Sequence, residues 1–404
     1  MQTTQNRPLV SIGVPVFNDA PWLCNALDHL LSQDYNNLEI ILADDGSTDG
    51  SRDICREYAN RDERIRLFEN KHNLGALQNH KFVFDASKGD YFAWGSGHDY
   101  LHPAFVSRLL ENLQANPSVV MCCPQSVFVS ENGEILRTPK GGLDTRGLAS
   151  VTRLGKLLAH LVGGGTANIF YGLYRQEALA QMNLSRKVDG CDVIILGELS
   201  LLGEMTQVNE VLYYRLVTIA ETGKQRAARH TEMLAGARGF NIVVLMPYFS
   251  ASCEFLSIAE NDRLSAIERQ RVYDKVVKLD VNIGRAAIAD EIMQFISIAK
   301  RELISLDAYL QIKQYRAAQI LDVLEKAWLL GFEYDGLHEL RSICLSAMGV
   351  QAEARAAEQE AARFYRKEKT QRIYSHYRLK VAAFLHKLIG DKAWRLLQRF
   401  IALK

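Results

Sequence analysis

The chain has 404 residues, of which 48% are hydrophobic and 24% charged, so it can build the cores of two or three globular domains. No stretch approaches the roughly 18 uncharged apolar residues of a membrane-spanning helix, and the polar start, Met1 to Pro8, predicts no signal peptide. The seven scattered cysteines show no metal-finger or C-x-x-C spacing, which favours reduced thiols in a cytosolic protein.

The net charge of +1 conceals a strong asymmetry along the chain. From Arg363 to Lys404 there are 12 Lys/Arg and 2 Asp/Glu, a net charge of +10, which leaves about −9 for the rest. The sequence therefore predicts an acidic body with a basic tail.

Up to about residue 220, short apolar segments alternate with amphipathic ones, which predicts an α/β fold with a mostly parallel, Rossmann-like sheet and helices on both faces. Ligands of such sheets bind beyond the carboxyl ends of the strands. The expected strands are Leu9–Phe17, Leu38–Asp44, Ile65–Glu69, Tyr91–Trp94 and Val119–Val129, and the expected helices are Pro21–Ser32, Ser51–Asn60, Leu74–Ala86 and Pro103–Ala115.

The second half of the chain is predicted to be all-α. All eight prolines lie at or before Pro247, and 22 of the 27 glycines precede Gly284. Lys313–Trp328 and Gly349–Phe364 align at an offset of 36 residues, as in tetratricopeptide-like helix pairs, although a plain helical bundle is the simpler alternative. We expect domains at 1–225 and 226–365, followed by a basic tail at 366–404.

Polar side chains follow the predicted strands where a ligand would lie. Asp44 and Asp45 end the second strand, and a helix N-cap needs fewer carboxylates than this. A carboxylate here can accept hydrogen bonds from a base or a ribose. The next loop, "NKHNLGALQNHK", supplies Asn73 and Lys81, which suit a phosphate-rich ligand. The loop "WGSGHDYLHP" after the fourth strand adds His98 and Asp99.

Five segments follow one another over about residues 8–216: "VSIGVPVFND", "LEIILADDGSTDGS", "NKHNLGA", "KGDYFAWGSGHDYLHP" and "YGLYRQEAL…DGCDVIILGELSLLGEMTQVNEVLYYRL". In this order they resemble glycosyltransferase family 2. The resemblance implies a GT-A fold, inversion at the anomeric carbon, and a nucleotide diphosphate sugar as donor, with a UDP-sugar expected. It also implies that Pro15, Phe17 and Asp45 hold the nucleotide, with Asp45 facing the base and Asp44 beside it.

The family's D-x-D motif for a divalent cation is altered in this chain. Its positions read Ser96, Gly97 and His98, and only the next residue, Asp99, is acidic. Mg²⁺ takes few protein carboxylates, so Asp99 is the expected ligand of Mg²⁺ or Mn²⁺, with His98 assisting the softer ion or donating to a phosphate. Alternatively, Asp99 caps the helix near Pro103 and His98 is a surface turn residue.

A general base is needed to deprotonate the acceptor hydroxyl. "VDGCDVIILGEL" offers Asp189 and Asp192 before an apolar helix, and the resemblance favours Asp192 as the base. A purely structural cap is the alternative. Trp94 fits a core position better than a stacking role, and Arg215 suits a diphosphate or a surface ion pair equally well.

We therefore expect an inverting glycosyltransferase, EC class 2.4, that acts on a saccharide or lipid-linked acceptor in bacterial surface polysaccharide assembly, with no nucleic-acid partner. Two alternatives remain open: a nucleotide-sugar-binding protein with impaired catalysis, and a helical interaction protein acting through residues 226–404.

The segment 379–403 places Val381, Leu385 and Phe400 on one helical face opposite basic residues. Such a helix either binds an anionic membrane from the cytoplasm or packs on the preceding helices.

Overall fold

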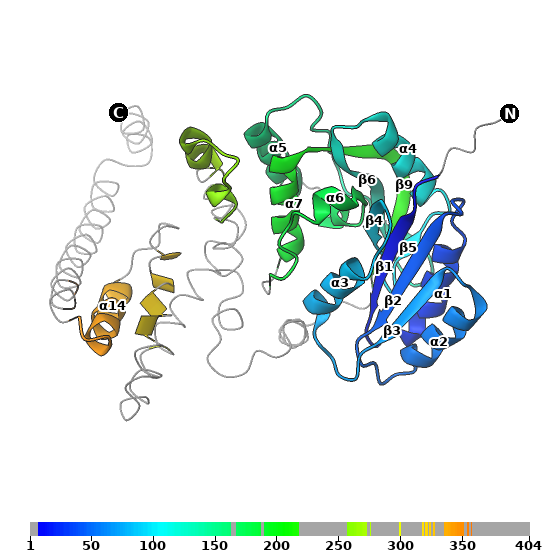
Figure 1. Cartoon of the computed structure of the whole chain (residues 1–404), viewed down its shortest axis with the longest axis horizontal. Helices are drawn as coiled ribbons and strands as arrows, with labels where there is room; N and C mark the ends of the chain where they lie inside the picture. Colours follow the sequence, from blue (N-terminus) through cyan, green and yellow to red (C-terminus); the bar gives the residue numbers. More distant parts are fainter. Residues whose placement is uncertain are drawn as a thin grey trace, which may run out of the picture. The chain divides into compact units, whose positions relative to one another are not determined.

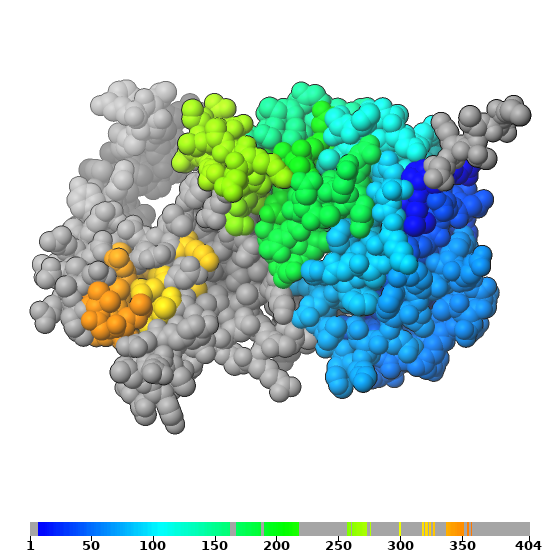
Figure 2. Space-filling view, viewed as in Figure 1, coloured from blue at the N-terminus to red at the C-terminus, as the bar shows by residue number. Residues whose placement is uncertain are grey.

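A computed structural model of the chain describes residues 7–162, 167–186, 190–217, 257–272 and 335–350, with single residues and pairs between 275 and 357 (Figure 1). It divides into two compact units, Met1–Ile288 and Ala289–Lys404. In the space-filling view, the blue to green residues of the first unit form one continuous packed body (Figure 2).

The first unit is built on a sheet whose described strands are β1 (Val10–Val16), β2 (Leu38–Asp44), β3 (Ile65–Glu69), β4 (Tyr91–Trp94), β5 (Tyr100–Leu101), β6 (Val119–Val129), β7 (Ile135–Arg137), β8 (Leu173–Arg175) and β9 (Glu204–Leu216). Their order is β3-β2-β1-β4-β8-β6-β9-β5, with β7 paired to β6. The strands from β3 to β4 are parallel. β8 runs antiparallel between β4 and β6, and β9 is parallel to β6.

Helices cover both faces of this sheet. They are α1 (Ala20–Leu31), α2 (Ser51–Arg61), α3 (Ala76–Asp85), α4 (Phe105–Ala115), α5 (Ser150–Val162), α6 (Gln176–Leu179) and α7 (Cys191–Leu202), with the 3-10 turns η1 (Ala167–Phe170) and η2 (Ile258–Glu260). Because side chains alternate along a strand, Ile40 of β2 packs with the α1, α2 and α4 side, whereas Ile41 packs with α3, α5 and α7. Burial on both faces explains why β1 and β2 read as nearly continuous apolar runs.

The predicted α/β class is confirmed. The five predicted strands are found with ends that differ by at most one residue. The short strands β5, β7 and β8 carry no length signal and were not predicted. Every described element after Leu216 is helical, as predicted.

In the second unit, α14 (Asp335–Ala347) packs through Leu345 against Ala354 and Ala357, with Leu321 beside them. The predicted boundaries at 225 and 365 and the tail at 366–404 lie outside the described residues. Most of the two repeat segments also lies outside them, so the tetratricopeptide-like pairing stays a prediction.

Candidate active site

A cavity of about 500 Å³ lies at the carboxyl edge of the parallel strands in the first unit. Pro15 and Phe17 reach it from the end of β1, Asp45 from the residue after β2, and Trp94 from the end of β4. Its other walls come from α3, η1, the start of α7 and the end of β9. This is the edge at which open α/β sheets bind their ligands.

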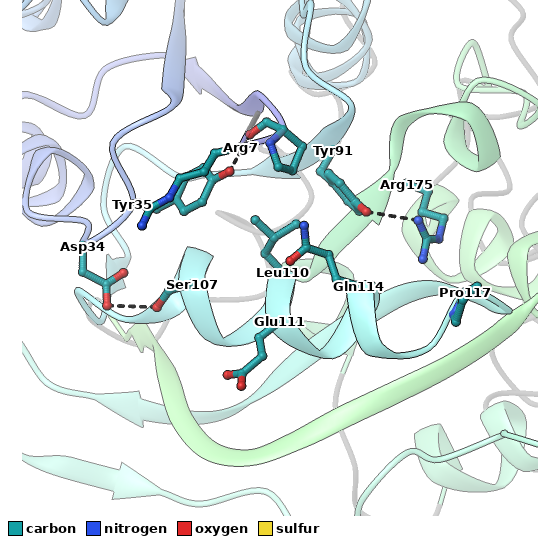
Figure 3. Close-up of a pocket in the computed structure, with 11 residues that line it drawn as sticks. Arg7, Asp34, Tyr35, Tyr91, Ser107, Leu110, Glu111, Gln114, Pro117 and Arg175 are labelled. Atoms are coloured by element: carbon teal, nitrogen blue, oxygen red, sulfur yellow. Dashed lines mark hydrogen bonds between the residues drawn. The ribbon is translucent and has the colours of Figure 1, made fainter. Parts of the chain in front are cut away.

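A second cavity, of about 840 Å³, lies near the amino ends of β1 and β4 (Figure 3). Its polar side chains serve the fold: Tyr91 accepts a hydrogen bond from Arg175 at 3.1 Å, and Ser107 donates to Asp34 at 2.9 Å. Arg175 also donates to the carbonyl of Leu113 at 2.6 Å near the end of α4. None of the predicted site residues lines this cavity.

Asp45 lines the first cavity and also shapes its wall. Its Oδ1 accepts hydrogen bonds from the side chain of Asn70 and the backbone N–H of Leu74, both at 2.9 Å, and its Oδ2 accepts one from the N–H of Gly75 at 3.0 Å. These bonds hold the loop that carries Asn73, another predicted nucleotide-binding residue, against the cavity.

Asp44 is not brought to the cavity. It lies on the last residue of β2, so its side chain points to the opposite side from that of Asp45. There its Oδ2 accepts a hydrogen bond from Arg52 at 2.8 Å, and its buried Oδ1 has no hydrogen-bond partner among the described residues. The geometry therefore gives Asp44 a place beneath the site, and its predicted contact with the nucleotide stays untested.

The turn after β1 holds a residue that the sequence analysis did not single out, Asp19. The preceding Asn18 has a positive φ of 55°, the one such non-glycine residue in the described part of the chain. Its side chain accepts a hydrogen bond from Thr48 N–H at 2.9 Å, which ties the loops after β1 and β2 together. Asp19 lines the cavity, and its only sequence signal was its place at the end of "VFND".

Helix α3 presents His80 and Lys81 to the cavity. The ammonium of Lys81 pairs with Asp85 on the same helix. Nδ1 of His80 donates to the carbonyl of Ala76 at 2.7 Å, so the neutral ring carries its proton there. Burial lowers the pKa of His80, and the charge of Arg215 lowers it further, which keeps the ring neutral at pH 7.

The two predicted metal residues have different surroundings. His98 lines the cavity, and its Nδ1 lies 3.0 Å from Oδ1 of Asp19. Burial would lower the pKa of His98, but Asp19 and Asp99 raise it overall. Asp99 lies behind the cavity with 1% of its side chain exposed, where Tyr213 donates to its Oδ2 at 2.5 Å and the N–H of Leu216 donates to its Oδ1 at 2.8 Å.

This arrangement does not fit a bound divalent cation. Mg²⁺ and Mn²⁺ need a carboxylate oxygen that faces the ion, whereas both oxygens of Asp99 are hydrogen-bonded inside the protein. Nε2 of His98 lies 4.0 Å from Oδ1 of Asp99, beyond hydrogen-bond distance. No group of three or more His, Cys, Asp or Glu side chains suited to a metal occurs in the described residues. The cation therefore takes no part in the mechanism below.

Asp192 lines the same cavity from the first turn of α7. The N-cap of this helix is Gly190, with a left-handed φ of 72°. The amino end of a helix favours a carboxylate in its ionised form, which a general base requires. The alternative base, Asp189, lies outside the described residues.

Arg215, near the end of β9, is another cationic side chain in the wall of the cavity. Its Nη1 lies 3.4 Å from Oδ2 of Asp99, and its guanidinium lies 5.6 Å from the centre of the Tyr171 ring. Tyr171 in turn stacks on Tyr213 at 4.9 Å. Trp94 is 1% exposed and stacks on Phe170 at 4.4 Å, which confirms it as a core residue.

Fold and cavity together define an α/β protein with a ligand site at the carboxyl edge of its sheet. The model of the family "Glycosyl transferase family 2" matches residues 11–173, which hold most of this edge. This part of the chain is therefore a glycosyltransferase family 2 domain.

Two of the similar proteins each match a little over a quarter of the chain. The chain is 33% identical over 113 residues to glycosyltransferase GlyG of Streptococcus pneumoniae serotype 4, a match over 28% of this chain and 38% of the relative. It is 37% identical over 116 residues to the uncharacterized glycosyltransferase EpsJ of Bacillus subtilis, over 29% of this chain and 33% of the relative. The chain thus spans little more than a third of the length of these relatives.

Among solved structures, S. aureus TarS 1-349 in complex with UDP-GlcNAc is similar, with a TM-score of 0.48 and 14% identity over 89% of this chain and 92% of that one.

None of the helices in the described part of the chain has the length and apolar character needed to cross a membrane.

Proposed function

We propose that this chain transfers a sugar from a nucleoside diphosphate sugar to a hydroxyl group of an acceptor, with inversion at the anomeric carbon. The observation that carries the proposal is the cavity, which gathers Asp45, Asp192 and Arg215 from distant parts of the sequence. The family match over residues 11–173 supports the same reaction class.

In this mechanism the nucleoside lies near Phe17, Asn73 and Asp45. Asp192 accepts the proton of the acceptor hydroxyl as its oxygen attacks the anomeric carbon. The bond from that carbon to the donor's phosphate oxygen breaks, and the nucleoside diphosphate leaves with the electron pair. One displacement inverts the configuration, so no covalent intermediate on the protein is needed.

We propose a UDP-sugar as donor and a saccharide or lipid-linked acceptor in bacterial surface polysaccharide assembly, at the cytoplasmic face of the membrane. The similar proteins reported above are glycosyltransferases of bacteria, which supports a bacterial setting. The basic tail at 366–404 supports the membrane location through its charge alone.

The experiment is a panel of nucleotide sugars with the full chain, in which release of nucleoside diphosphate is measured with and without acceptor. Asp192→Asn keeps the shape of the side chain and removes its basicity. We expect donor binding to be unchanged and the transfer rate to fall by about 10²-fold or more.

Asp53→Asn is the matched control, because Asp53 also lies in the first turn of a helix but is 82% exposed and does not line the cavity. Equal rates for wild type and Asp192→Asn would refute the assignment of the base. Binding of a nucleotide sugar without turnover would instead favour the impaired binding protein, a reading that the altered D-x-D positions support.

A further inference from the structure

The contacts of Asp99 indicate a structural role, in which its carboxylate holds neighbouring groups of the protein in place. Tyr213, the N–H of Leu216 and Arg215 approach its two oxygens from the protein side, and the side chain does not line the cavity. To hold an ion, Asp99 would have to give up hydrogen bonds that compensate the burial of its charge.

Arg215 has the opposite character. Its side chain is 30% exposed and lines the cavity, and its guanidinium contacts Asp99 through Nη1 and lies over the ring of Tyr171. A guanidinium offers several N–H donors in a fixed fork that matches phosphate oxygens. Holding it in place beforehand reduces the loss of side-chain freedom when a phosphate binds.

Among the cationic side chains that line the cavity, Arg215 is the one best placed to bind a phosphate. Lys81 is paired with Asp85, and His98 is paired with Asp19, which itself lines the cavity. The partner of Arg215, Asp99, does not line it, and Asp45 adds negative charge. A donor diphosphate adds more, and it needs a cation where its leaving oxygen gains charge.

We propose that Arg215, positioned by Asp99, binds the diphosphate of the donor in the role that a divalent cation has in the D-x-D pattern. Asp99 is then a positioning residue. When the bond to the anomeric carbon breaks, the electron pair moves to the phosphate oxygen, and the guanidinium of Arg215 stabilises it through N–H donation. This inference rests on the proposed function and adds the group that stabilises the leaving group.

The test is calorimetric titration of the full chain with UDP and GDP and with the matching nucleosides, uridine and guanosine, in EDTA and again in Mn²⁺. We expect a diphosphate to bind more tightly than its nucleoside in EDTA, with little gain from Mn²⁺. Arg215→Met should weaken diphosphate binding by about 10- to 100-fold, the usual effect of losing hydrogen bonds to a charged group, and leave nucleoside binding unchanged.

Two further variants separate the effect of the position of the Arg215 guanidinium from the effect of its charge. Arg215→Lys keeps the charge without the fork and should restore part of the loss. Asp99→Asn should also weaken diphosphate binding, equally in EDTA and in Mn²⁺. Arg61→Met, a control on an exposed arginine whose ion pair is with Glu57 on its own helix, should bind as wild type does.

Diphosphate binding that requires Mn²⁺ and is unaffected in Arg215→Met would overturn this inference and leave the proposed function standing. If no nucleotide or nucleoside binds under either condition, the proposed function fails, and this inference fails with it. Should Asp99→Asn not fold, Arg215→Met and Arg215→Lys still decide the matter.

Discussion

Glu39 joins three strands below the candidate site. From β2, its Oε1 accepts hydrogen bonds from Ser11 Oγ on β1 and from the N–H of Lys88, both at 2.6 Å. Its Oε2 accepts one from Arg66 on β3 at 2.8 Å. Because 10% of the Glu39 side chain is exposed, these bonds are largely shielded from water.

The perturbation is Glu39→Gln, which keeps the shape, removes the charge and turns an N–H₂ group or a neutral oxygen toward Arg66. Losing a hydrogen bond to a charged group costs about 1–3 kcal/mol of unfolding free energy. For a unit of this size, each kcal/mol is worth roughly 2–4 °C in the midpoint of thermal unfolding.

The pH dependence gives the prediction a second observable. Burial would raise the pKa of Glu39, but the hydrogen bonds from Ser11, Lys88 and Arg66 outweigh it, and the folded pKa lies below its ordinary value of 4.5. The stabilisation is therefore fully present above about pH 4.5 and is lost as the pH falls through the folded pKa.

Thermal unfolding of wild type and Glu39→Gln is measured from pH 7 to about pH 3.5, where we expect the difference to be largest at pH 7 and to shrink at the acid end. Glu111→Gln is the control, since Glu111 pairs with Arg108 at the surface and should matter by less than about 1 kcal/mol. The reasoning is refuted if Glu39→Gln melts with wild type at pH 7, or if its deficit is the same at every pH.

Two other changes have defined outcomes. Gly97→Ala would place its Cβ 2.8 Å from Cγ of Asp19, so we expect the free energy of unfolding, measured by denaturation, to fall by about 1–3 kcal/mol. Gly142→Ala, whose Cβ would lie 3.5 Å from Gln207, should unfold as wild type does, and equal stability of all three proteins would contradict the close packing at Gly97. Removal of residues 366–404 should abolish salt-sensitive flotation with anionic vesicles, and a truncated protein that still floats would rule out the basic tail as the membrane contact.

The parallel half of the sheet was predictable because its strands are buried on both faces. Ile40, Ile41 and Leu42 all face apolar neighbours, so β2 reads as an uninterrupted run bounded by turn residues. By contrast, β8 has three residues, Leu173–Arg175, and is held between β4 and β6 by long-range pairing. No local pattern of that length separates a strand from a loop.

The candidate site was predictable as a set of loops but not atom by atom. The pair Asp44 and Asp45 shows why: Asp44 ends the second strand and Asp45 follows it, so alternation sends one side chain to Arg52 and the other to the cavity. Residue type alone does not decide which of two adjacent carboxylates faces the cavity. The family resemblance assigns that place to Asp45, and the register and the covering helices give the physical reason for it.

The loop at 94–103 shows the same limit of prediction from sequence. His98 and Asp99 are neighbours in the chain, and the comparison with the D-x-D motif predicts that both bind one ion. In the fold, β5 begins at Tyr100 and pairs with β9, which brings Tyr213, Arg215 and Leu216 against Asp99. This pairing places Asp99 against residues more than a hundred positions away in the sequence, which hydrogen-bond to both of its oxygens. If Arg215 takes the role of the cation, as we propose, the β5–β9 pair sets where the positive charge of the site lies.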